Sequence, residues 1–189
     1  MKRVLILILI IFIAPLIAGV YGIIHDQITF SISPEYYTKF KFYQFGLMDV
    51  GNEAIFPHPR FEVSVVGLLA TWWMGIPIGI ILGLVGLVIK DYRQMFRITM
   101  RAFGITIIIA FLTGIIGLFY GKLFLTEAGI NWWLPENLID IKNFIAVGSM
   151  HNFSYLGGLT GVIAGIIYIV RQNFKLHINS KDHPGDSIV

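Results

Sequence analysis

The chain has 189 residues, of which 56% are hydrophobic and only 13% are charged. Soluble domains carry about 25% charged residues, so this chain has too few to cover a soluble surface. The high hydrophobic content also excludes a disordered chain. The net charge of the chain, +3, is small, and its Lys and Arg residues lie beside apolar runs. No nucleic-acid partner is therefore expected. The absence of cysteine excludes disulfides, iron–sulfur clusters and thiolate zinc sites. A polytopic membrane protein is the class that remains.

Four apolar segments are long enough to cross a bilayer, which takes about 20 helical residues for ~30 Å of hydrocarbon. These segments are residues 4–24, 63–89, 102–121 and 144–170. Because backbone amides inside a bilayer must be hydrogen-bonded within their own segment, each span is predicted to be a helix. The sequence therefore predicts an all-α membrane protein that forms one integral membrane domain, residues 1–189.

The remaining residues form two outer loops, 25–62 and 122–143, a cytoplasmic loop, 90–101, and a cytoplasmic tail, 171–189. Nine of the fourteen Lys and Arg residues lie in the tail, in loop 90–101 or before the first span. They are Lys2, Arg3, Lys90, Arg93, Arg97, Arg101, Arg171, Lys175 and Lys181. Since Lys and Arg are concentrated on the cytoplasmic side of membrane proteins, both termini are predicted to face the cytoplasm.

Residues 1–22 also fit a signal peptide, with Lys2 and Arg3 before the apolar run and a cleavage site at Val20-Tyr21-Gly22. The apolar run reaches about 21 residues, however, which exceeds the usual 7–15 residues of a signal-peptide core. We therefore expect this segment to remain as the first span. Cleavage would leave three spans and move the new N-terminus to the outside.

The first outer loop is rich in aromatic residues, which a disordered linker would lack. They are Phe30, Tyr36, Tyr37, Phe40, Phe42, Tyr43, Phe45, Phe56 and Phe61. This loop is expected to fold onto the helix ends or to lie in the headgroup layer. Residues 27–33 alternate polar and apolar side chains, which predicts a short extended stretch. Ser33-Pro34-Glu35 predicts a helix start after it.

The second outer loop contains the pair Trp132-Trp133, which is typical of the aromatic belt at a membrane interface. A ligand-stacking site on the two tryptophans is the alternative. The apolar residues between Leu138 and Ile145 follow at helical spacing, which predicts an interfacial amphipathic turn that leads into the fourth span.

Small residues recur at every fourth position of two spans, which is the pattern of close helix packing inside membranes. The second span has Gly67, Thr71, Gly75, Gly79 and Gly83, and the fourth has Gly157, Gly161 and Gly165. These ridges lack large side chains and allow a neighbouring backbone to approach. The spacing leaves open whether the ridges join the second span to the fourth or join two protomers, so a homo-oligomer or another membrane protein remains a candidate partner.

Polar residues in the outer half of the fourth span form the second signal: His151, Asn152, Ser154 and Tyr155. At 100° per residue, His151 and Tyr155 point about 120° and 160° away from Gly157, so this span is expected to contact two neighbours. An intramembrane histidine is a candidate functional residue. The alternative is a neutral imidazole that is hydrogen-bonded between helices.

His25-Asp26-Gln27 lies where the first span ends, on the same side of the membrane as His151, Glu35 and His58. Imidazole and carboxylate groups suit a divalent metal or an acid–base pair. No compact metal motif is present, so no cofactor is predicted, and a divalent metal is kept as the less favoured alternative. A structural junction of these side chains is the simpler interpretation.

Several segments resemble a family of small, uncharacterised bacterial integral membrane proteins with four spans. That family carries the motifs H-D-Q-[IV]-T, E-Y-F-T, A-T-W-W and H-x-x-x-Y in this order. The matching segments here begin at His25, Glu35, Ala70 and His151, and Tyr37 replaces the usual Phe. The resemblance implies a bacterial inner-membrane location and implies no reaction.

The candidate polar cluster combines these motif residues with the residues discussed above. It comprises His25, Asp26, Gln27, Glu35, Tyr36, Thr71, Trp72, His151 and Tyr155. The favoured hypothesis is a non-enzymatic binding or assembly protein whose outward-facing cluster contacts a partner, a lipid or an ion. The alternative is a membrane enzyme or an oligomeric transporter that uses the His, Asp and Glu side chains. Convergence of His25, Asp26 and His151 within a few ångströms in an outward-facing pocket would support a functional site, and separation by a helix diameter would leave only a structural role.

Overall fold

The computed structural model describes residues 1–49 and 53–182, with side chains through Ile178. The described residues form helices and no strand, and four helices are long and apolar enough to span a membrane. The long helices are α1 (Lys2–Ile32), α4 (Pro59–Gly86), α5 (Tyr92–Tyr120) and α7 (Ile141–Asp182). This confirms the predicted all-α fold with four transmembrane helices.

The first and third long helices extend well beyond the predicted spans. α1 continues through His25 to Ile32, so the predicted extended stretch over residues 27–33 is wrong. Polar side chains there bond within the helix: the Thr29 hydroxyl donates to the His25 carbonyl at 3.2 Å, for example. α5 begins at Tyr92 because Asp91 caps it, accepting a 2.8 Å hydrogen bond from the Gln94 amide. Most of the expected loop 90–101 is therefore helix.

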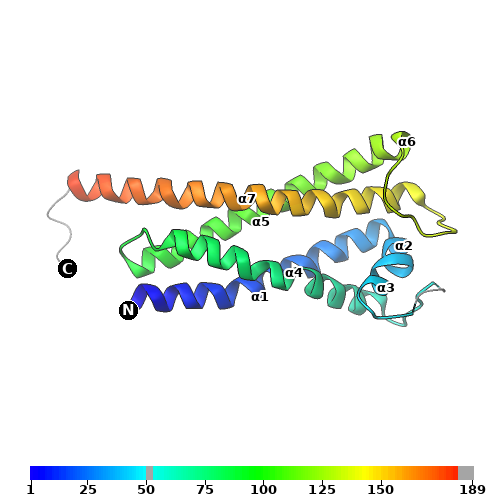
Figure 1. Cartoon of the computed structure of the whole chain (residues 1–189), viewed down its shortest axis with the longest axis horizontal. Coiled ribbons are helices and arrows are strands. Elements are labelled where there is room, and N and C mark those ends of the chain that lie inside the picture. Colours follow the sequence, from blue (N-terminus) through cyan, green and yellow to red (C-terminus); the bar gives the residue numbers. More distant parts are fainter. Residues whose placement is uncertain (50–52, 183–189) are drawn as a thin grey trace.

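The aromatic-rich loop folds onto the ends of the long helices that lie opposite the N-terminus and that the sequence predicts to be the outer ends. This folding is one of the two alternatives expected for the loop. It contains α2 (Pro34–Tyr36), the π-helical turn η1 (Tyr37–Lys41) and α3 (Phe42–Gln44). The helix start predicted at Ser33-Pro34 is confirmed, although the Ser33 side chain makes no cap hydrogen bond. These short helices close one end of the bundle (Figure 1).

After α5 the chain continues through the π-helical turn η2 (Gly121–Leu125) and α6 (Thr126–Ala128). Residues 129–140 are not helical, so the amphipathic turn predicted from Leu138 begins only at Ile141. The cytoplasmic tail predicted from residue 171 is helical as far as Asp182.

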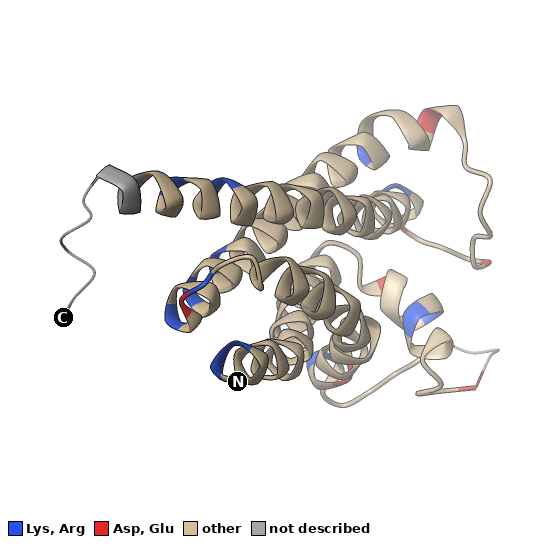
Figure 2. Cartoon of the chain, turned by 60° about the vertical axis from the view of Figure 1, so that its left-hand side comes forward, with Lys and Arg blue, Asp and Glu red and all other residues tan. Residues whose placement is uncertain are grey.

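The long helices form two antiparallel hairpins, α1 with α4 and α5 with α7. Contacts within each hairpin are far more extensive than contacts between the hairpins. The N-terminus and the C-terminal end of α7 lie at one end of the bundle, opposite α2 and α3 (Figure 1). Lys and Arg residues gather at the end that carries the N-terminus and the α4–α5 turn (Figure 2).

The glycine ridges explain why the hairpins pack so closely. A Cβ added at Gly67 would lie 2.5 Å from the Gly22 carbonyl oxygen, and one at Gly75 would lie 2.5 Å from the Ala14 carbonyl oxygen. On α7, a Cβ at Gly161 would lie 2.8 Å from the Thr106 carbonyl oxygen of α5. Each ridge thus packs within its own hairpin, α4 on α1 and α7 on α5, so the alternative that joins the second span to the fourth is wrong. Contact between two protomers stays a prediction.

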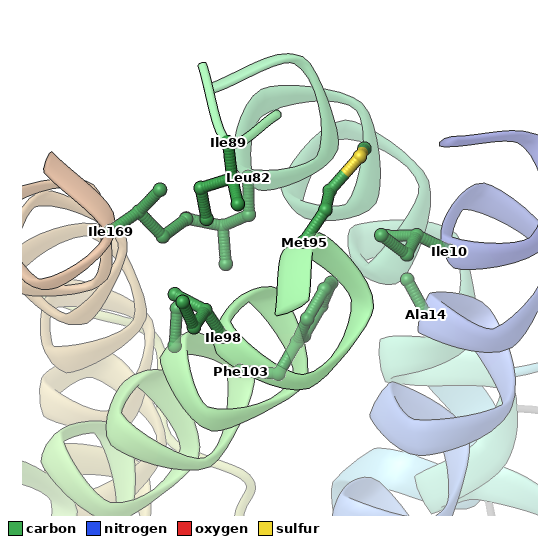
Figure 3. Close-up of a cluster of buried hydrophobic side chains, with 9 residues drawn as sticks. Ile10, Ala14, Leu82, Ile89, Met95, Ile98, Phe103 and Ile169 are labelled. Atoms are coloured by element: carbon green, nitrogen blue, oxygen red, sulfur yellow. The ribbon is translucent and has the colours of Figure 1, made fainter. Parts of the chain in front are cut away.

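Two buried apolar clusters occupy the two ends of the bundle. The cluster near the termini includes Ile10, Leu82, Met95 and Ile169 (Figure 3). The outer cluster is built on the aromatic-rich loop and on the start of α7 and includes Tyr37, Phe42, Val63 and Phe144. Between them, along both α1 and α7, lies a layer of buried polar side chains.

Replacing Gly75 should destabilise the first hairpin, because any side chain meets the backbone of Ala14 and Pro15. We expect Gly75→Ala to cost about 1–3 kcal/mol and Gly75→Leu to prevent assembly. Gly104→Ala is the matched control, because a Cβ there meets nothing within 4 Å and removing a helix glycine stabilises by roughly 0.5–1 kcal/mol. Thermal unfolding and native gels in mild detergent measure both, and normal assembly of Gly75→Leu would contradict the packing described.

Candidate functional site

Three residues that the sequence singled out converge in the buried polar layer between the hairpins. His25 and Asp26 come from α1 and His151 comes from α7, and their ligand-type atoms all lie within 4.8 Å of one another. Ser154, one turn further along α7, joins them. The four side chains are only 4%, 2%, 6% and 8% exposed in that order, so water and lipid hardly reach them.

The helices place these residues through two features. α1 continues past its apolar run, which carries His25 and Asp26 into the bundle. α7 packs its glycine face on α5 and turns His151 toward α1, as the angular spacing predicted. His25 and His151 meet edge to face, with ring centroids 4.8 Å apart.

One oxygen of Asp26 accepts contacts from both histidines. Oδ1 lies 3.2 Å from His25 Nδ1 and 3.3 Å from His151 Nε2. The other ring nitrogen of His151, Nδ1, lies 2.9 Å from the Val147 carbonyl oxygen, which can only accept, so Nδ1 carries a proton. An unprotonated Nε2 would repel the Asp26 oxygen, so a second proton lies between His151 and Asp26.

The remaining contacts fix the proton on His25. Its Nδ1 faces Asp26 Oδ1 and its Nε2 lies 3.1 Å from Ser154 Oγ. A proton on Nδ1 satisfies the carboxyl oxygen, and the hydroxyl of Ser154 then donates to the free Nε2. A second proton on His25 would leave an uncompensated positive charge in an apolar layer, because Asp26 balances only the extra proton that it shares with His151.

The aromatic-rich loop covers the outer side of this group. The Tyr36 ring stacks on His151 at a centroid distance of 5.0 Å. The Tyr37 hydroxyl lies 2.6 Å from Thr29 Oγ1, and burial raises the pKa of both tyrosines. Lys41 is buried beside the Tyr36 ring, and burial lowers its pKa although Asp26 opposes the shift. The loop therefore separates the site from water.

On the inner side the group borders a cavity of about 90 Å³ between the hairpins. His25, Asp26, His151 and Ser154 line one part of it, and the rest of the wall is mostly apolar. Tyr21 also lines the cavity, and its buried hydroxyl lies near the Ser154 side chain without a well-formed hydrogen bond. One water needs about 10–15 Å³ of such space, so the cavity has room for several small groups.

Three other members of the predicted cluster also lie at this site. Tyr36 stacks on His151, and Thr71 and Tyr155 line the cavity. The Thr71 hydroxyl lies within hydrogen-bond distance of two carbonyl oxygens, those of Ala18 and Gly67, at 2.8 Å each. Its main contribution is therefore to hold α4 against α1.

Gln27, Glu35 and Trp72 lie away from the site. Gln27 donates to Ser64 Oγ and to the Arg60 carbonyl of α4. The Trp72 side chain is 43% exposed on the outside of the bundle. His58, which the sequence placed on the same side, is also exposed, at the start of α4.

Glu35 joins the two outer loops. Its carboxylate accepts hydrogen bonds from the backbone amides of Ile139 and Asp140 and from Lys39 Nζ at 2.6 Å. Burial opposes ionisation of Glu35, but these donors outweigh it and lower its pKa. Its role is thus structural, and it holds the second outer loop against η1.

Ser154, Tyr21 and Lys41 complete the site, and sequence reasoning did not select them. Ser154 was noted only as one of several polar residues in the fourth span. Tyr21 lies one helical turn before His25, so the i, i+4 rule of helix faces could have indicated it. Lys41 carries no such signal, because only the folding of the loop buries it.

Comparisons with protein-family models, with curated proteins and with solved structures find no match to this chain.

Two substitutions of His151 distinguish the contribution of its hydrogen bond to Asp26 from that of its packing. We expect His151→Gln to keep most of the stability, because an amide can still donate to Asp26. His151→Leu should cost about 1–3 kcal/mol, because it leaves a buried Asp26 oxygen short of one donor. Asn152→Leu, an exposed neighbour on α7, is the control and should be near neutral. Thermal unfolding in detergent measures all three, and equal stability of the Gln and Leu variants would show that the contact contributes nothing.

Proposed function

We propose that this chain is a membrane-embedded enzyme that transfers or hydrolyses an acyl group, with Ser154 as its nucleophile. One observation carries the proposal: Ser154 Oγ, His25 and Asp26 Oδ1 lie in a continuous hydrogen-bonded series, with contacts of 3.1 and 3.2 Å. A serine hydroxyl that donates to an imidazole, whose other nitrogen donates to a carboxylate, is the arrangement that activates serine in acyl transfer.

The chemistry follows from the positions of the protons. Ser154 Oγ attacks the carbonyl carbon of an ester while His25 Nε2 takes the hydroxyl proton, and the negative oxygen of the tetrahedral intermediate balances the positive charge that this proton brings to His25. The carbon–oxygen bond to the alcohol breaks, and His25 returns the proton to the departing oxygen. Water then attacks the acyl-serine with His25 again as base, which releases the acid and restores Ser154. No oxidant or metal is needed to balance these steps.

Two further residues support this role. The buried Tyr21 hydroxyl lies near Ser154 in the cavity that both residues line, so it can donate to the negative oxygen of the intermediate. Asp26 is a positioning residue, since it holds His25 with the proton on Nδ1 and acts only through that ring. His151 positions Asp26 in turn.

Sequence reasoning favoured a non-enzymatic binding or assembly protein and kept an enzyme as the alternative. The criterion it set was convergence of His25, Asp26 and His151 within a few ångströms. Their ligand-type atoms lie within 4.8 Å, which supports a functional site, although the aromatic-rich loop covers it and the pocket does not face outward. A transporter is less well supported, because the buried polar group lies at one level of the bundle between two apolar clusters.

We also propose that the termini face the cytoplasm and that the site lies in the outer half of a cell membrane. Basic residues cluster near the N-terminus and the α4–α5 turn, which supports this orientation (Figure 2). The family resemblance further suggests a bacterial inner membrane. Because the chain has no cysteine, a single Cys at exposed Ile139 should react with an impermeant maleimide in intact cells. Reaction of this Cys only after cell lysis would contradict the proposed orientation and place the termini outside.

A divalent metal ion is the second candidate ligand, favoured by the buried Asp26 Oδ2, which makes no well-formed hydrogen bond although the Tyr37 hydroxyl lies close to this carboxyl group. The ion would be held by His151 Nε2, Asp26 and His25 Nδ1. It would take the place of the proton between His151 and Asp26 and of the proton on His25 Nδ1. Zinc bonds of about 2.0–2.1 Å require ligand atoms no more than ~4.2 Å apart, so the widest pair would have to close slightly. Such an ion would remove the activation of Ser154, and the two candidates therefore exclude one another.

The test is covalent labelling of the purified protein by a fluorophosphonate, which reacts with activated serines. We expect one phosphonylated residue, Ser154, identified by peptide mass spectrometry. Ser154→Ala should abolish labelling, and His25→Gln should slow it by roughly 10²–10⁴, the usual contribution of a general base. Ser149→Ala is the control, since Ser149 is an equally buried α7 serine without a partner, and it should label normally.

Metal analysis of the same preparation completes the experiment. Ser154 could prove unreactive while the protein holds one zinc ion per chain that His151→Gln loses. That result would contradict the enzyme and support the metal site. An unreactive Ser154 in a folded, metal-free protein would refute the enzyme and return the polar group to a structural role.

A further inference from the structure

A second, larger hollow lies on the outside of the bundle, between α1 and α5. It is a groove of about 600 Å³ at the junction of the two hairpins. Its walls are apolar apart from Tyr21 and His25 and include Leu16, Val20, Ile108 and Leu112. In a protein that spans a membrane, side chains on this face meet lipid tails and not water.

The groove and the inner cavity share part of their walls. Tyr21 and His25 line both hollows, as do the apolar residues Ile17 and Ile107. The inner end of the groove therefore reaches the same imidazole that contacts Ser154. A molecule in the groove would place one end at the polar group and the rest along the lipid-facing surface of α1.

The sizes of the two hollows indicate which of them can hold a long acyl chain. The cavity of about 90 Å³ is too small for a long chain, whereas the groove is several times larger. The lining of the groove runs along α1 from Leu16 to Ile28, a length of ~18 Å at 1.5 Å per residue. One leaflet of hydrocarbon is about 15 Å deep, half of the ~30 Å core. The groove thus matches one lipid chain in one leaflet.

We infer that the substrate is a lipid ester whose long acyl chain enters sideways from the membrane and lies in the groove between α1 and α5. This inference deepens the proposed acyl transfer at Ser154 and rests on it. The ester group reaches the cavity past Tyr21 and His25, and the chain stays on Val20, Ile108 and their neighbours. Water-soluble esters have no comparable route, because the aromatic-rich loop covers the outer side of the site.

The inference is tested with two fluorophosphonates that differ only in a short or a long alkyl chain. The rate of Ser154 labelling is measured for both in the same detergent. We expect the long-chain probe to react about ten-fold faster or more, because the groove positions it for attack. The ratio of the two rates is then compared between variants, since partition of each probe into micelles is the same for all of them.

Ile108→Trp fills the groove, and Ile116→Trp is the matched control on the same helix. Both side chains face outward, with exposed fractions of 58% and 61%, and Ile116 does not line the groove. We expect Ile108→Trp to reduce the rate ratio to near one while short-chain labelling persists, and Ile116→Trp to keep the wild-type ratio.

Each other outcome points to a different failure. Equal rates for both probes in the wild type would overturn the lipid inference and leave Ser154 chemistry intact. The lipid inference would also be overturned if Ile116→Trp lost the preference for the long-chain probe as fully as Ile108→Trp does. The groove would then not be the source of that preference. Absence of labelling by either probe would instead contradict the proposed function itself.

Discussion

The carboxyl oxygen Oδ1 of Asp26 lies within hydrogen-bond distance of two imidazole rings, in a buried layer of the bundle. The arrangement of the site depends on these two contacts. Within the membrane, a polar atom without a partner costs several kcal/mol, so each donor and acceptor in the layer constrains the next. The Val147 carbonyl fixes the proton on His151, the shared proton neutralises Asp26, and the balance of charge leaves His25 neutral. Ser154 then meets a free imidazole nitrogen.

The packing of the helices explains why such a site exists between the hairpins and not within them. Glycine ridges bring α1 and α4, and α5 and α7, into backbone contact, which leaves no room there for imidazole rings. The two hairpins meet over a much smaller area, where side chains and hollows fill the space. The hydrogen bonds between Ser154 and His25 and between His151 and Asp26 cross this junction. The same loose junction opens to the lipid as the groove beside α5.

Much of this fold could be predicted from the sequence, because hydropathy and glycine spacing report directly on membrane helices. The orientation of His151 away from the Gly157 ridge also followed from helical geometry alone. The boundaries were less predictable: the alternating residues 27–33 suggested a strand, but packing of Gln27 on α4 and internal bonds of Thr29 keep them helical. Burial of Lys41 and the partner of each glycine ridge depend on tertiary contacts, which no local pattern encodes.

The composition of the site was only partly predictable for a similar reason. His25, Asp26 and His151 are rare residue types in apolar segments, so they stand out in the sequence. Ser154 and Tyr21 do not, because serine and tyrosine are common in membrane helices, and only the register of α1 against α7 gives them a role. Gln27 and Glu35, in contrast, were selected by their chemistry and proximity in sequence, yet they bind the outer loops and helix ends together.

The proposed chemistry requires a neutral His25, with its proton on Nδ1 and a free Nε2 facing Ser154. Nitrogen-15 NMR of the protein labelled only at histidine measures this directly, because protonated and unprotonated ring nitrogens resonate far apart. The His25 signals are identified by their loss in His25→Gln. We predict the neutral Nδ1–H form for His25 and a protonated Nδ1 for His151. A His25 ring protonated on Nε2, whether neutral or cationic, would contradict the account, since Ser154 would then have no base.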